Sequence, residues 1–140
     1  MSLTLKERQE FLAQPHVAAL SVAGGPDRGP LSVPIWYQYE PGGEPWVMTG
    51  ADSRKLRLIQ ESGRFTLLVQ RTEPTTRYVA VEGPVAKIIP LTEELHVEMV
   101  RRYLTGDAVD HYLKQAEGFG DQVVVYLRPE HWLSADLGGV

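Results

Sequence analysis

The residues with the clearest chemical potential lie in one short window, where a predicted strand ends and a helix begins. Thr49 closes an apolar segment, and Ser53, Arg54 and Lys55 follow at the expected start of the helix. The first backbone N–H groups of a helix have no partner within it, and the helix dipole attracts anions to this end. Basic side chains alone are unfavourable there, whereas a phosphate would be held by the hydroxyl, guanidinium and ammonium groups together. The window therefore predicts a phosphate site, the alternative being a merely solvated basic face.

Strands are expected on both sides of this window, because apolar or aromatic runs of strand length alternate with turn residues. The predicted strands, about six in all, cover 16–22, 31–39, 46–50, 64–70, 77–89 and 122–127. Pro34 removes one ladder hydrogen bond from the second of them, which favours an edge, a bulge or a ligand-facing position. Because the strands come in runs rather than in regular alternation with helices, we predict a mostly β fold, a small antiparallel barrel decorated by short helices.

Short helices are expected between some of these strands. Ser53, or Asp52 before it, would cap the helix of the phosphate window, and Gly63 would end that helix. The other helices are expected after a capping box at Thr4 and Glu7, after Thr92, and over 107–117. The Gly83-Pro84 pair marks a bulge or bend in the longest strand.

Composition narrows the functional classes. The chain has 140 residues, 14 Lys and Arg against 18 Asp and Glu, and no cysteine. This length fits one domain, residues 1–140, and the lack of cysteine excludes disulfides, thiolate nucleophiles and Cys-ligated zinc. The net charge of −4 argues against a sequence-independent nucleic-acid binder.

No apolar run fits a membrane span or a signal peptide, so we expect a cytoplasmic protein without a membrane partner. The four histidines lack ligand spacing, so no metal site is expected, and no residue is assigned as catalytic.

The order of these segments resembles the pyridoxamine-phosphate-oxidase-like split-barrel superfamily, whose members bind FMN or the deazaflavin coenzyme F420. The resemblance extends from His16 to about Trp132. It rests on the SRK motif in the window from Thr49 to Leu58 and on the YVAVEG motif from Tyr78 to Gly83. It implies a six-stranded antiparallel split β-barrel of Greek-key topology, forming a single FMN-binding domain.

The resemblance also implies a set of cofactor-binding residues. These are Val33, Pro34, Ile35 and Trp36 along the edge of the isoalloxazine ring, Met48 and Thr49 at the end of the next strand, Ser53, Arg54 and Lys55 at the phosphate, and Tyr78, whose position often reaches the cofactor of the partner subunit. The oxidases themselves have glutamine at the position of Tyr78. Members of the family are dimers with two cofactor sites at the subunit interface, so a homodimer is implied here.

The activity implied is that of an oxidoreductase that binds FMN, or alternatively F420, and transfers a hydride to a small unsaturated organic substrate. The tail, with Arg128, His131 and Trp132, does not match the substrate residues of the vitamin B6 oxidases, so we expect a small flavin or deazaflavin reductase. Two other hypotheses remain: a non-catalytic carrier or sensor of flavin, haem or deazaflavin, and a plain β-barrel interaction domain with no cofactor.

Overall fold

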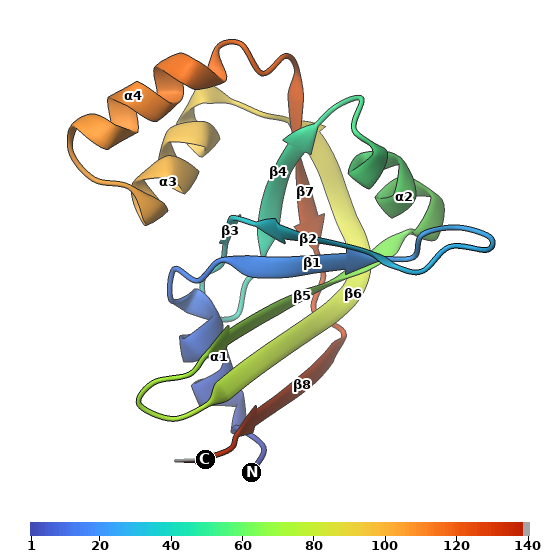
Figure 1. The fold of residues 1–140 in the computed structure, drawn as a ribbon, viewed down its shortest axis with the longest axis vertical. Coiled ribbons are helices and arrows are strands. Elements are labelled where there is room, and N and C mark those ends of the chain that lie inside the picture. The colour runs from blue at the N-terminus through green and yellow to red at the C-terminus, as the bar shows by residue number, and fades with distance from the viewer. Residues whose placement is uncertain (139–140) are drawn as a thin grey trace.

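Eight strands and four helices form residues 1–138 of the computed structural model, which are the residues that the structure describes (Figure 1). The strands are β1 (Ala18–Val22), β2 (Leu31–Ile35), β3 (Tyr37–Gln38), β4 (Trp46–Gly50), β5 (Arg64–Arg71), β6 (Arg77–Pro90), β7 (Gln122–Leu127) and β8 (His131–Asp136). The helices are α1 (Leu5–Ala13), α2 (Arg54–Ser62), α3 (Glu93–Tyr103) and α4 (Asp107–Ala116). The mostly β composition predicted from the sequence is confirmed, although the number of strands is larger than expected.

The strands form a curled antiparallel sheet in the order β2-β1-β5-β6-β7-β4-β3, with β8 as a further partner of β6 (Figure 1). The long strand β6 links the two parts of this sheet. Its first part, 77–82, lies between β5 and β8, and its last part, 85–90, pairs with β7. The register with β7 shifts between Val85 and Lys87, next to the bend predicted at Gly83-Pro84. This arrangement is the antiparallel barrel that the sequence pattern predicted, in the split form that the resemblance implied.

One extra strand arises because the predicted strand 31–39 is interrupted at Trp36. The resulting strands β2 and β3 lie at opposite ends of the sheet order. The N–H of Tyr37 donates to the hydroxyl of Tyr103 at 3.1 Å, so a side chain of α3 replaces a strand partner at this point. Pro34 lies in β2, where an edge strand tolerates the missing backbone donor.

The other extra strand, β8, comes from the segment that the sequence analysis treated as a tail. It continues along the same edge of β6 as β7, with His131 opposite Glu82 and Asp136 opposite Arg77. Ser134 is buried whereas Leu133 is exposed, so side chains alternate between the two faces as in any half-buried strand. The inner face carries Trp132, Ser134 and Asp136, and its two polar residues hid this alternation in the sequence.

Three of the four helices begin at the predicted capping residues, and α2 also ends at the predicted one. The Ser53 hydroxyl accepts a backbone N–H in the first turn of α2, and Gly63 ends that helix with a left-handed φ of 75°. Thr4 and Glu7 form both hydrogen bonds of a capping box at α1, and the side chain of Thr92 caps α3. These local signals were therefore sufficient to place the start of each of these helices.

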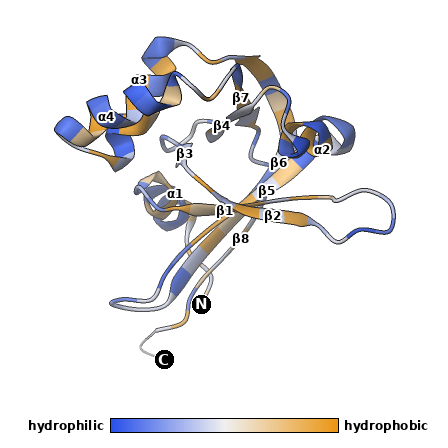
Figure 2. Cartoon of the chain, turned by 45° about the horizontal axis from the view of Figure 1, so that its top comes forward, coloured by the Kyte–Doolittle hydropathy of each residue, from blue (hydrophilic) through white to orange (hydrophobic). Residues whose placement is uncertain are grey.

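Two apolar clusters hold the elements in place, and their residues give the sheet its hydrophobic stretches in Figure 2. The larger cluster fills the barrel and includes Phe11 of α1 and Leu56 and Ile59 of α2. The smaller cluster, built around Trp46 and Met99, joins α3 to the sheet. Burial of Leu56 and Ile59 fixes the start of α2 against the strands, and this start forms part of the site described below. Within residues 1–138, none of the helices is both long and apolar enough to cross a membrane.

Candidate functional site

A cavity of about 360 Å³ lies where β4 ends and α2 begins. Its lining residues are Pro34, Ile35, Trp36, Met48, Thr49, Gly50, Ser53, Lys55, Tyr112, Phe119 and Gln122. Those also predicted from the sequence are Pro34, Ile35, Trp36, Met48, Thr49, Ser53 and Lys55. The fold thus brings three separate segments, the end of β2, the end of β4 and the start of α2, to one cavity.

The far wall of the cavity comes from the C-terminal half of the chain, which the sequence analysis did not implicate. Gly50 at the end of β4 lies opposite Gln122 at the start of β7, so the loop between α4 and β7 is brought to the cavity. Gly50, Gln122, Tyr112 and Phe119 are the lining residues that were missed. Strand pairing between segments so far apart leaves no local signal. The glycines on both sides of Phe119 were the one available hint of an exposed aromatic side chain.

Hydroxyl groups and free backbone amides form the polar end of the cavity. The hydroxyl oxygens of Thr49 and Ser53 share a hydrogen bond of 3.0 Å, and the Ser53 oxygen also accepts the Leu56 N–H at 3.1 Å. The N–H groups of Arg54 and Lys55 have no hydrogen-bond partner within residues 1–138. Two amide donors at the start of a nine-residue helix are therefore available to an anion.

Lys55 provides the cationic charge at this end. Its side chain is half-buried and lines the cavity, and burial lowers the pKa of its ammonium group. No carboxylate within residues 1–138 lies within 4.0 Å of it. A lysine that loses hydration without gaining a counter-ion favours an anionic ligand, because the ligand would restore the missing stabilisation of the charge.

Aromatic and apolar groups form the other end. The ring of Trp36 stacks on Tyr103 with centroids 4.7 Å apart and an interplanar angle of 8°, and lies 5.3 Å from the ring of Tyr112. Trp36 is therefore held in place by α3 and α4 while it lines the cavity. Rings fixed in this way form a rigid flat wall, as a planar ligand requires.

Three of the predicted residues do not line this cavity. Val33 faces the barrel core opposite Leu20, although it also borders a neighbouring groove. Arg54 is exposed at the start of α2. Tyr78 lies in β6 between β5 and β8, opposite Gln70 and Ala135. Tyr78 therefore does not contact the cavity of its own chain, and the implied contact with a partner subunit stays a prediction.

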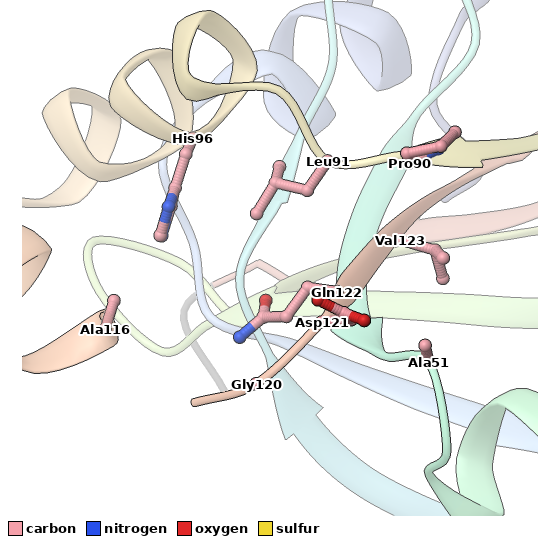
Figure 3. A pocket seen from close by; sticks show the side chains of 9 residues that line it. All are labelled: Ala51, Pro90, Leu91, His96, Ala116, Gly120, Asp121, Gln122 and Val123. Atoms are coloured by element: carbon pink, nitrogen blue, oxygen red, sulfur yellow. The ribbon is translucent and has the colours of Figure 1, made fainter. Parts of the chain in front are cut away.

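A second cavity, of about 450 Å³, adjoins the first through Gln122, which lines both (Figure 3). Its walls include His96 of α3 and Asp121 in the loop before β7, and no lysine or arginine. Burial lowers the pKa of His96, which favours the neutral imidazole. A cavity with a carboxylate and a neutral histidine disfavours anions, so of these two cavities the smaller one has the groups that suit an anion.

The model of the protein family described as "Pyridoxamine 5'-phosphate oxidase" matches residues 4–135 of the chain. The conserved hypothetical protein Rv2991 from Mycobacterium tuberculosis is 26% identical, with a TM-score of 0.73, and the match covers 96% of this chain and 85% of that one. An F420 reductase is 22% identical with a TM-score of 0.71, covering 89% and 94% of the two chains. HutZ, the haem storage protein from Vibrio cholerae, is 14% identical with a TM-score of 0.64, covering 99% and 98%. No curated protein sequence matches the chain. From the fold, the SRK turn at the cavity and the match over residues 4–135, we conclude that the chain belongs to the pyridoxamine 5'-phosphate oxidase family.

Proposed function

We propose that the protein is an oxidoreductase that binds a phosphate-bearing flavin-type coenzyme, FMN or F420, and acts on a small unsaturated organic substrate. The observation that carries this proposal is the half-buried Lys55, which lacks a counter-ion and lies beside the free amides of α2 in a cavity whose other end is aromatic. A phosphate fits the first end and a flat ring fits the second. The coenzyme would supply the hydride chemistry, and the protein would bind and orient it.

Different residues of the cavity would contact different parts of the coenzyme. Ser53 and Lys55 would hold the phosphate with the amides of α2, and the exposed Arg54 would reach it from outside. The backbone from Val33 to Trp36 would lie along the ring edge, and Met48 and Thr49 would also contact the coenzyme. Tyr112 and Phe119 would keep water from the ring. Since the lining includes no carboxylate and no histidine, the cavity offers binding and orientation rather than acid–base catalysis.

The charge beyond the phosphate site supports F420 as the coenzyme, in preference to FMN. Arg54 and Arg57 are exposed and lie three residues apart on one face of α2. Neither forms an ion pair within residues 1–138. The phosphodiester of F420 continues into an acidic tail that two such arginines would attract, whereas FMN ends at its phosphate. The neighbour that is an F420 reductase agrees with this choice.

Titration of the purified protein with FMN and with F420, followed by coenzyme fluorescence, tests this proposal. We expect both to bind and F420 to bind more tightly, with an affinity that falls as salt is added because exposed charges are screened. Double substitution of Arg54 and Arg57 by alanine should remove most of the preference for F420. Absence of binding by either coenzyme would reject this proposal and leave the hypotheses of a haem carrier and of a β-barrel interaction domain.

Turnover distinguishes an enzyme from a carrier. Each reduced coenzyme would be mixed with a panel of quinones and enones, and its consumption followed by absorbance. Catalysed oxidation above the rate without protein supports the oxidoreductase. Tight coenzyme binding without turnover on any member of the panel would support the carrier, a role that the fold also serves in a haem storage protein.

The outward face of the sheet supports a homodimer with the coenzyme near its interface. Neighbouring strands place five apolar residues in one row on this face: Pro34, Ala19, Leu68, Ala80 and Leu133. All five are exposed or half-buried, whereas the residues that alternate with them along β1, β5 and β6 are buried in the barrel. A solvent-facing sheet surface is usually polar, so a continuous apolar row indicates a contact surface. Pro34 also lines the coenzyme cavity, and Tyr78 shares the outward face with Ala80.

Replacement of Leu68 by lysine is expected to convert the dimer into a monomer, because the charge would be buried in the middle of the apolar row. Light scattering after gel filtration measures the change as a halved molecular mass. Thr66→Lys is the matched control, since Thr66 lies on the same face of β5 in the adjacent polar row, opposite Ser21 and Glu82. A wild-type chain that is monomeric at all concentrations would contradict the dimer.

A further inference from the structure

Among the Phe, Tyr and Trp side chains within residues 1–138, that of Phe119 is the only exposed one, and it lines the coenzyme cavity. Half of its surface, 51%, is accessible to solvent. The loop that carries it is folded tightly: Phe119 donates its N–H to Ala116 O at 3.0 Å, and Gly120 adopts a left-handed φ of 75°. An exposed phenyl ring fixed at the mouth of a cavity is unfavourable in water, and it gains stability when a ligand covers it.

A chain of aromatic rings connects Phe119 with the core. Tyr112 meets Phe119 edge-on, with centroids 6.1 Å apart at 81°, and its ring lies 5.3 Å from that of Trp36. Trp36 stacks in turn on Tyr103, whose hydroxyl donates to His16 O at 2.7 Å. Each ring is packed against the next, so the position of Phe119 is set by anchored neighbours rather than by the loop alone.

Lys55, at the start of α2, is the one charged side chain among the lining residues, and the uncharged polar side chains are those of Thr49, Ser53, Tyr112 and Gln122. The apolar part of the lining includes the rings of Trp36, Tyr112 and Phe119 and the side chains of Ile35 and Met48, and no carboxylate is among the lining residues. Such a surface stabilises flat conjugated molecules by stacking and offers nothing to compensate a buried charge on them.

We propose that Phe119, positioned by Tyr112, is the specificity-determining wall for the second ligand of the site, and that this ligand is flat, conjugated and uncharged. The inference rests on the proposed function, because the ligand would lie between Phe119 and the coenzyme ring. Beyond the proposed function, the inference names Phe119 as the residue that selects the substrate, and flat uncharged conjugated molecules as the class selected.

The test uses the full chain and menadione, a flat uncharged quinone, as the probe. Binding is measured twice: to the coenzyme-loaded protein by quenching of coenzyme fluorescence, and to the protein alone by tryptophan fluorescence. Phe119→Ala is expected to weaken menadione binding about tenfold in the loaded protein and to weaken coenzyme binding by clearly less. Phe119→Leu keeps much of the apolar volume but lacks the flat ring. Its affinity for menadione should lie between that of the wild type and that of Phe119→Ala. Leu5→Ala on α1, where Leu5 is exposed to a similar extent at 55%, is the control and should bind menadione as the wild type does.

Two results would overturn the inference. One is menadione binding to Phe119→Ala with wild-type affinity, and the other is an equal loss of coenzyme affinity, which would make Phe119 a wall for the coenzyme instead. Failure of the wild type to bind either coenzyme would reject the proposed function separately. In that case, loss of menadione binding to the coenzyme-free Phe119→Ala protein would still support the aromatic wall, and its retention would reject it.

Discussion

Replacing Lys55 with alanine is expected to weaken the binding of FMN and of F420 by about ten- to a hundredfold, the effect of losing one charge-assisted contact. The side chain is half-buried at the polar end of the cavity and has no carboxylate neighbour within 4.0 Å in residues 1–138. The phosphate would therefore be its main counter-ion. Removing Arg54 as well should increase the loss, but by less, because Arg54 is exposed and more strongly hydrated.

Equilibrium titration by coenzyme fluorescence measures this effect, and thermal unfolding of the coenzyme-free protein checks the fold. Lys55→Ala should leave the Tm of the coenzyme-free protein unchanged or slightly raised, because no ion pair is lost and a desolvated charge is removed. Lys55→Arg keeps the charge and should retain most of the affinity. Lys6→Ala, at an exposed position on α1, is the control for a simple change in net charge. Equal affinities for wild type and Lys55→Ala would place the phosphate elsewhere.

Lys55 tests the phosphate site more cleanly than Ser53 does. The Ser53 hydroxyl caps α2 and is bonded to Thr49, so its removal changes both the helix and the site. Loss of an N-cap alone destabilises a protein by about 1 kcal/mol. A weaker affinity in Ser53→Ala would therefore have two explanations, whereas a weaker affinity in Lys55→Ala has one.

The parts of the site that could be predicted are those whose signals are local. Ser53 and Gly63 mark the ends of α2 through capping, and the same serine places the free amides and Lys55 beside the end of β4. Pro34 predicted an edge, a bulge or a ligand-facing position, and β2 is an edge strand. Each of these inferences needs only a few neighbouring residues, because caps, turns and proline act through the backbone close to them.

The parts that could not be predicted depend on contacts between distant segments. Tyr112 and Phe119 reach the cavity only because β7 pairs with β4, and the residues themselves give no sign of this pairing. The division of the strand at Trp36 depends on the Tyr103 hydroxyl, which arrives from α3. The cavity thus combines a local anion site, visible in the sequence, with an aromatic wall that exists only in the folded chain.

Gly83, the last residue of the YVAVEG motif on which the resemblance partly rests, has a structural role in the fold. Gly83 is buried in β6 where the chain passes from β7 to β8, and an added Cβ would come within 1.8 Å of the carbonyl oxygen of Arg128. The backbone cannot easily withdraw, because the N–H of Arg128 donates to Pro84 O at 3.0 Å and that of Glu130 to Glu82 O at 2.9 Å. Only glycine allows the two strands to share this edge of β6.

Gly83→Ala is therefore expected to destabilise the protein by about 3 kcal/mol or more, the upper range for overpacking a rigid site. Thermal unfolding should show a fall in Tm of roughly 10 °C for a chain of this size. Gly29→Ala is the matched control, since a Cβ there meets no atom within 4 Å and the glycine does not have a positive φ; its Tm should stay within about 2 °C of wild type. A Gly83→Ala protein as stable as this control would mean that β7 and β8 do not meet β6 as described. If the folded fraction of Gly83→Ala binds coenzyme normally, the motif combines two separable roles, a structural one at Gly83 and the partner contact proposed for Tyr78.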